Sequence, residues 1–139
     1  MQPIDVKRIH SSFAAQSMMA TFGAELLEVS EGHVRIKAPI LPVALQQQGF
    51  GHAGLTFSLG DSAAGYAALT MLPLDFEVVT AEIKINLLAP AKGDHLIATG
   101  EVIKPGKRLC VVRSEVRAVK QGTETLIAVL QGTMVPVPA

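Results

Sequence analysis

The segment from Ala53 to Leu72 most constrains the fold, because it is the longest stretch without strand alternation or proline. It ends just before Pro73, as helices tend to do. One stripe of this predicted helix carries large side chains, those of Leu55, Leu59, Tyr66 and Leu69. Much of the remaining surface is small: Gly60, Ala63, Ala64, Gly65, Ala67 and Ala68. Glycine weakens an isolated helix, so we expect close packing against a sheet or another helix.

Most of the remaining chain predicts strands. Alternating apolar and polar residues, separated by turn residues, place them at 24–29, 33–38, 77–89, 95–104, 108–119 and 125–135. Turns at Pro105-Gly106 and Gln121-Gly122 make the last three an antiparallel meander. Residues 5–19 predict a short amphipathic helix. The order αββαββββ indicates an α+β domain whose largely antiparallel sheet curls around one central helix.

The length of 139 residues fits one domain, residues 1–139, with an N-terminal helical segment at 1–21. Apolar residues make up 49% of the chain and charged residues only 17%. That apolar content suggests that some surface is buried between subunits. We therefore expect an oligomer.

The charge balance argues against two classes of partner. Twelve basic residues match twelve acidic ones, so nothing draws the chain to nucleic acid or to an anionic membrane. Tryptophan is absent, so no base-stacking platform is visible. The apolar runs are short and no signal-peptide pattern is present. The expectation is a cytoplasmic protein without nucleic-acid or membrane partners.

Cysteine and histidine usage argues against metal and disulfide chemistry. Cys110 is the single cysteine and lies in an apolar stretch, which favours a buried structural thiol over a nucleophile. The histidines are too scattered for metal-ligand spacing. We expect no metal and no separate cofactor.

Asp61 is the one ionisable carboxylate between Ala53 and Leu74. On a helical wheel it lies away from the leucine stripe, beside Phe57 and Gly65. Two interpretations are open. The carboxylate is either simply exposed, or held in a partly dry pocket where it can act as a base or a nucleophile.

The polar, glycine-rich stretch 46–54 leads into the start of the same helix. It is predicted to leave free backbone N–H groups at Ala53, Gly54 and Leu55, at the positive end of the helix dipole. Such groups can polarise a carbonyl and stabilise an oxyanion. An ordinary junction between a loop and a helix has the same sequence pattern.

Together these features resemble a known family. His52-Ala53-Gly54 and the stretch 59–68 (Leu-Gly-Asp-Ser-Ala-Ala-Gly-Tyr-Ala-Ala) resemble the His-Gly-Gly and Leu-x-Asp-x-Ala-x-Gly signature of hotdog-fold acyl-CoA thioesterases of the phenylacetate-degradation type. Residues 86–91 match the family's strand ending in a Pro-Ala turn, and 104–107 match its hairpin. The resemblance extends from about Phe22 onward and implies a hotdog fold.

The resemblance also implies roles for single residues. Asp61 corresponds to the general base or nucleophile, and the N–H of Gly54 to the donor that polarises the thioester carbonyl. Gln46 stands where many relatives have an Asn that positions water or substrate, a role open also to Gln47 and Gln48. Thr80 aligns with a residue that orients the nucleophilic water. His52 corresponds to a loop-fixing hydrogen-bonder rather than a proton carrier.

Ala53 and the cations of the 104–108 turn complete the expected site. Ala53 replaces the usual first glycine, which keeps the N–H but requires ordinary backbone angles. Lys107 and Arg108 are candidates for the CoA phosphates. A solvated turn with ordinary surface cations remains the alternative for this pair.

The expected function is hydrolysis of an acyl-CoA thioester, by a water that Asp61 activates or by direct attack of Asp61. Phe50, Phe57 and Tyr66 would suit an aromatic or medium-chain acyl group, although core packing explains them equally well. The alternatives are a hotdog hydratase or dehydratase and a non-catalytic acyl-CoA-binding protein. The former generally needs a histidine near the acid, and none follows Asp61 before His95.

Helix geometry predicts that each site is shared between subunits. Asp61 lies eight residues beyond Ala53, or roughly 12 Å along a helix that rises about 1.5 Å per residue. One thioester carbon cannot contact both Asp61 and the helix start of the same chain. Antiparallel central helices in a two-fold dimer would bring them together. We therefore expect a homodimer as the minimal unit. A homotetramer is the expected assembly, and the dimer alone remains the alternative.

Overall fold

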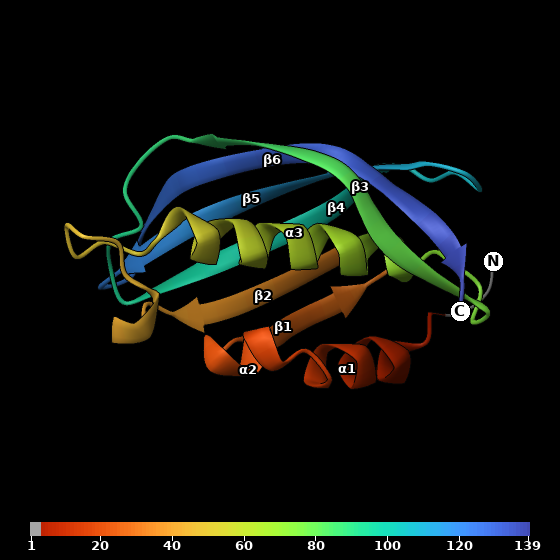
Figure 1. The fold of residues 1–139 in the computed structure, drawn as a ribbon, viewed down its shortest axis with the longest axis horizontal. Helices are drawn as coiled ribbons and strands as arrows, with labels where there is room; N and C mark the ends of the chain where they lie inside the picture. The colour runs from red at the N-terminus through yellow and green to blue at the C-terminus, as the bar shows by residue number, and fades with distance from the viewer. Residues whose placement is uncertain (1–3) are drawn as a thin grey trace.

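The computed structural model describes residues 4–139, in which one antiparallel sheet wraps around a long central helix (Figure 1). The strand order is β1-β2-β4-β5-β6-β3. The elements are α1 (Val6–Ala14), α2 (Ser17–Thr21), β1 (Glu25–Ser30), β2 (His33–Pro39), the 3-10 helix η1 (Pro42–Ala44), α3 (Ala53–Leu69), β3 (Phe76–Leu87), β4 (His95–Lys104), β5 (Cys110–Lys120) and β6 (Thr123–Pro138). The expected hotdog fold is confirmed.

Helix α3 packs closely against the sheet, as its small residues predict. Its four large stripe residues are buried, and so are its alanines from position 63 onward. A Cβ added at Gly60 would lie 2.9 Å from the Leu130 side chain, and one at Gly100 of β4 would lie 2.3 Å from the Ala63 backbone. Glycine is therefore required on both sides of this contact, which holds α3 tightly in the concave face of the sheet.

The strand pairing confirms the meander of β4, β5 and β6 and adds one connection that was not predicted. Strand β3 does not pair with β4, its neighbour in sequence, but with β6. Thr80 of β3 is thereby opposite Met134 of β6, which is opposite Cys110 of β5. Strand β3 also lies at one edge of the sheet, next to α3.

Two helices replace the single helix expected at 5–19. The chain leaves α1 after Ala14, and Gln16 has an extended backbone before α2 begins. There the Gln16 side chain donates a 2.7 Å hydrogen bond to the Tyr66 hydroxyl. A tertiary contact thus overrides helix periodicity, which a sequence pattern does not report. Residues 1–3 of the expected N-terminal segment lie outside the described residues.

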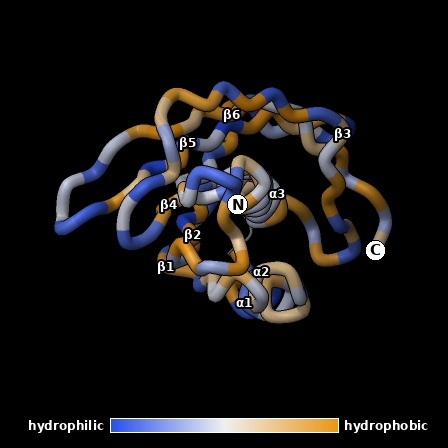
Figure 2. The backbone as a smooth tube through the Cα atoms, turned by 60° about the vertical axis from the view of Figure 1, so that its left-hand side comes forward, coloured by the Kyte–Doolittle hydropathy of each residue, from blue (hydrophilic) through white to orange (hydrophobic). Residues whose placement is uncertain are grey.

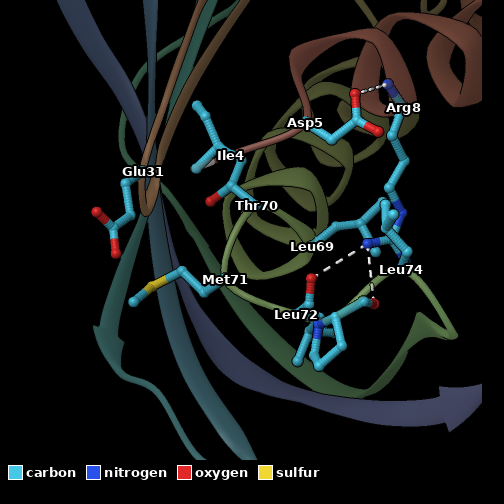
Figure 3. Close-up of a pocket in the computed structure, with 10 residues that line it drawn as sticks. Ile4, Asp5, Arg8, Glu31, Leu69, Thr70, Met71, Leu72 and Leu74 are labelled. Carbon is cyan, nitrogen blue, oxygen red and sulfur yellow. Dashed lines mark hydrogen bonds between the residues drawn. The ribbon is translucent and has the colours of Figure 1, made fainter. Parts of the chain in front are cut away.

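The N-terminal helices lie at the open side of the curved sheet, where Figure 2 shows an arch around α3. Arg8 of α1 is anchored at the far end of α3. Its guanidinium donates to the carbonyls of Leu72 at 3.2 Å and Pro73 at 3.0 Å (Figure 3). It also donates to the carbonyl of Phe76. These bonds tie α1 to the loop that follows α3, and they hold α1 across the C-terminal half of α3.

Two boundaries differ from the expected ones. Helix α3 ends at Leu69 rather than near 72, because the Thr70 hydroxyl bonds the Ala67 carbonyl and accepts the N–H of Gly32 at 2.8 Å. Strand β6 continues to Pro138, beyond the expected end near 135, because β3 provides a pairing partner as far as Phe76.

Candidate active site

Asp61 lies on the side of α3 that faces the edge strand β3. Its side chain is half-buried. This burial lies between the two interpretations of the sequence, a simply exposed carboxylate and one held in a partly dry pocket. The Thr80 hydroxyl donates a 2.7 Å hydrogen bond to its Oδ1 atom. Thr80 Oγ1 also lies 3.3 Å from the Met134 sulfur, but a hydroxyl has one proton and a carboxylate is the stronger acceptor. Thr80 therefore fixes one carboxylate oxygen and leaves the other available.

A pocket of about 260 Å³, here the Asp61 pocket, opens beside this carboxylate between α3 and β3. Leu69, Val78 and Met134 provide its apolar lining. Its far wall contains Tyr66, whose hydroxyl lies 2.7 Å from Gln16 Nε2 and 3.1 Å from Ser12 Oγ. The segment around α1 thus contributes directly to the surroundings of Asp61.

At the start of α3, His52 is the N-cap residue, and its ring Nδ1 accepts the N–H of Gly54 at 2.7 Å. The N–H of Leu55 bonds the carbonyl of His52 at 3.0 Å. Two of the three N–H groups that were expected to be free are therefore paired, because the histidine caps the helix. Within residues 4–139 the N–H of Ala53 has no such bond. All three residues from His52 to Gly54 are exposed.

The loop before this helix is braced by Gln46. Its Oε1 atom accepts the N–H of Phe50 at 3.3 Å and that of Gln48, and its Nε2 donates to Gln48 Oε1 at 3.3 Å. Gln46 is half-buried, whereas Gln47 and Gln48 are exposed. In this structure the Gln46 amide is thus engaged with its own loop.

A second pocket, here the helix-start pocket, has a volume of about 520 Å³ and lies over the beginning of α3. Its lining includes the three glutamines, His52, Ala53 and the end of β3, and it contains no carboxylate. It has no lining residue in common with the Asp61 pocket. The two halves of the expected site are therefore separate within one chain.

Lys107 and Arg108 lie apart from both pockets, in the turn between β4 and β5. Both are exposed, and neither forms an ion pair within residues 4–139. Lys107 lines a third cavity of about 520 Å³, here the turn cavity, next to Ala68 and Cys110. Cys110 is 3% exposed, and burial raises the pKa of its thiol, as expected of a structural cysteine.

The sequence did not indicate four residues that surround Asp61: Ser12, Gln16, Tyr66 as a polar group, and Met134. Met134 lies 54 residues beyond Thr80, and only the pairing of β3 with β6 brings them together. Ser12 and Gln16 are ordinary polar residues of a predicted amphipathic helix, so neither offered a signal of its own. Phe50 lines the helix-start pocket, while Phe57 packs against the core.

The antiparallel sheet wrapped around α3 is the fold of the hotdog class of thioesterases. The family model of the thioesterase superfamily matches residues 48–125, so the chain belongs to that superfamily. The chain is a thioester hydrolase.

Individual proteins agree with this assignment. A thioesterase family protein from Silicibacter pomeroyi is 36% identical, with a TM-score of 0.93 over 96% of this chain and 98% of that one. A protein of Saccharolobus solfataricus named as an unproven esterase is 31% identical over 78% of this chain and 72% of its own. The 1,4-dihydroxy-2-naphthoyl-CoA hydrolase of Listeria monocytogenes is 29% identical over 65% of this chain and 73% of its own.

In residues 4–139, no group of three or more His, Cys, Asp or Glu side chains is arranged to hold a metal ion. Over the same residues, no helix is long and apolar enough to cross a membrane.

Proposed function

We propose that this protein hydrolyses an aromatic or medium-chain acyl-CoA to the free acid and CoA, with Asp61 as the catalytic carboxylate. The observation that carries the proposal is the half-buried Asp61 carboxylate, which Thr80 holds by one oxygen beside a pocket. The other oxygen is available to take a proton from water. A carboxylate with one oxygen held by a hydrogen bond and the other free to accept a proton suits general-base catalysis.

The reaction balances with these groups. Water attacks the thioester carbon while Asp61 takes one of its protons, and the carbonyl oxygen becomes an oxyanion. Collapse of this intermediate breaks the carbon–sulfur bond, and the CoA sulfur leaves with the proton that Asp61 returns. In the alternative route, a carboxylate oxygen of Asp61 attacks the carbon, the carbon–sulfur bond breaks and CoA leaves as the thiolate. Water then hydrolyses the resulting anhydride, which releases the acid, regenerates the Asp61 carboxylate and supplies the proton that the thiolate takes up.

The oxyanion needs a donor that the Asp61 pocket does not contain. We assign that role to the N–H of Gly54 in a second subunit, supported by its place at the helix start and by the separation of the two pockets. In this structure the same N–H is bonded to His52. The substrate oxygen therefore shares or replaces the imidazole, and His52 keeps the loop in place until the substrate binds.

We further propose binding roles for Ala53, Gln46 and the two cations of the turn between β4 and β5. Ala53 offers an N–H at the rim of the helix-start pocket, and the Gln46 amide has to leave its own loop to reach a substrate. Lys107 and Arg108 suit the CoA phosphates, since both are exposed and form no ion pair within residues 4–139. We propose a homodimer with antiparallel α3 helices as the minimal unit, paired into a homotetramer.

Pocket size and one relative support the substrate class. At about 260 Å³ the Asp61 pocket is below the usual range of ligand pockets, about 300–1,000 Å³, so it fits an acyl group rather than a whole acyl-CoA. Its lining by Leu69, Val78 and Met134 suits a ring or a hydrocarbon chain. The Listeria relative is named for an aromatic acyl-CoA, which agrees with this choice.

A panel of acyl-CoAs with a chromogenic thiol trap tests the proposal. Release of free CoA from phenylacetyl-CoA or octanoyl-CoA, faster than from acetyl-CoA, is the expected result. Hydration of an enoyl-CoA without thiol release would indicate a hydratase, and binding of acyl-CoA without turnover would indicate a non-catalytic module. Single turnover in oxygen-18 water separates the two routes, because only the covalent route places label in Asp61.

A further inference from the structure

We propose that Met134 sets the upper length of the acyl group, by closing the Asp61 pocket off from the apolar turn cavity behind it. The inference rests on the proposed function, since it assumes that the acyl group occupies the Asp61 pocket. It concerns a residue with no place in the sequence motif. Met134 is fully buried, and its position follows from the strand register.

The register places Met134 between the two cavities. Across β6, Met134 is opposite Thr80 on one side and Cys110 on the other. Thr80 lines the Asp61 pocket, and Cys110 lines the turn cavity. Two residues further along the strands, Val78 of β3 is opposite Pro136 of β6. Val78 lines the Asp61 pocket and Pro136 lines the turn cavity, so this pair again has one cavity on each side. The two cavities therefore run side by side for two rows of the sheet.

The helix residues that pack around Met134 are small, among them Ala64 and Ala68. Gly65 lines the Asp61 pocket and Ala68 lines the turn cavity, three residues apart on one helix face. A Cβ added at Gly65 would lie 3.9 Å from the Met134 Cε atom, which shows that the methionine end reaches the helix backbone. The flexible thioether thus fills the space between sheet and helix that two small residues leave open.

The space behind Met134 suits a hydrocarbon chain. The turn cavity has about 520 Å³, twice the volume of the Asp61 pocket, and its lining includes Leu72, Phe76, Pro105 and Cys110. Lys107 is its one charged lining residue, and no carboxylate lines it. An acyl tail that passed Met134 would enter an apolar chamber, so the methionine is the side chain that decides between a short and a long occupant.

The test compares Met134→Ala with Met134→Leu across straight-chain acyl-CoAs from butanoyl to hexadecanoyl. Leucine keeps nearly the same volume and is the matched control. For the wild-type protein and Met134→Leu, kcat/KM should fall once the chain exceeds the pocket. For Met134→Ala the fall should come several carbons later, with a gain on the order of fourfold in kcat/KM for each additional methylene that becomes buried.

Two further variants keep the test decisive. Met134→Val removes less of the side chain and should shift the preferred length in the same direction by a smaller amount, which decides the matter if Met134→Ala does not fold. Ala68→Leu added to Met134→Ala refills the turn cavity and should restore the shorter preference.

The outcomes distinguish the proposed role of Met134 in limiting acyl length, here the Met134 gate, from the proposed function. An unchanged ranking of chain lengths in folded, active Met134→Ala or Met134→Val overturns the gate. A uniform loss at every length also overturns it, because it indicates that Met134 acts only by supporting Thr80 at 3.3 Å. If the wild-type protein hydrolyses no acyl-CoA of any length, the proposed function itself is rejected, and the gate with it.

Discussion

The start and the middle of α3 differ in what they offer a substrate. The start is exposed and supplies backbone N–H groups, glutamine amides and an imidazole, but its pocket has no carboxylate. The middle supplies a half-buried carboxylate and a threonine hydroxyl, but no free N–H group from a helix end. Hydrolysis of a thioester needs both a base and an oxyanion donor. Neither region of one chain contains the complete chemistry.

The largest expected effect comes from removing the base in the middle of the helix. Asp61→Asn should lower kcat by about two orders of magnitude or more, while CoA affinity and the fold are retained. The asparagine carbonyl still accepts the Thr80 hydrogen bond, so the loss reports proton transfer rather than packing. Steady-state kinetics on the best acyl-CoA of the panel provides the measurement, and near-normal turnover would remove Asp61 from the mechanism.

Mixing two inactive variants tests whether the two regions meet across a dimer. Gly54→Val obstructs the helix start, because even a Cβ at Gly54 would lie 3.0 Å from the His52 ring. Asp61→Ala removes the base. Random co-assembly makes half the dimers mixed, each with one intact composite site, so activity should return to about a quarter of that of the wild-type protein.

A shared site and an independent site give opposite results in that experiment. If each chain held its own complete site, no mixture of the two variants would recover activity. The control is verification of the mixed dimers by differential tagging, together with the circular dichroism of each parent. Persistent inactivity of folded, verified heterodimers therefore rejects the shared site.

A smaller effect is expected when the carboxylate is kept but its anchor is removed. Thr80→Val is nearly isosteric and deletes the 2.7 Å hydrogen bond to Asp61. A hydrogen bond to a charged group contributes about 1.5–3 kcal/mol, so kcat should fall by about tenfold or more. Thr80→Ser is the matched control and should retain most activity. Equal kcat values for Val and Ser would show that Thr80 does not position the base.

The fold was predictable from sequence to a greater extent than the site. The periodicity of apolar residues and the positions of turn residues located the central helix and the meander. They also located five of the six strands to within about two residues at each end. The break at Gln16 and the pairing of β3 with β6 were not predictable, because both depend on contacts between distant segments. The motif identified Asp61 and the helix start, but Met134 and the Tyr66 wall belong to the pocket only through this long-range pairing and packing.

The smallest expected effect concerns the turn at the far end of the sheet. Lys107 and Arg108 are exposed, and an exposed charge pair contributes only about 0–1 kcal/mol. Replacing both by alanine should therefore raise KM roughly fivefold for two phosphate contacts and leave kcat nearly intact. Lys7→Ala on α1, another exposed lysine, is the matched control and should change neither constant.

Salt dependence distinguishes phosphate recognition from a solvated turn. Exposed charges are screened within about 8 Å at physiological ionic strength, so KM of the wild-type protein should rise with salt and approach that of the double variant. The Lys7→Ala protein should follow the wild-type curve throughout. An unchanged KM in the double variant at low salt would assign both residues to ordinary surface. CoA recognition would then have to come from the start of α3, where the helix-start pocket includes Ala53 and His52, so both phosphate binding and the oxyanion donor would belong to the same end of the helix.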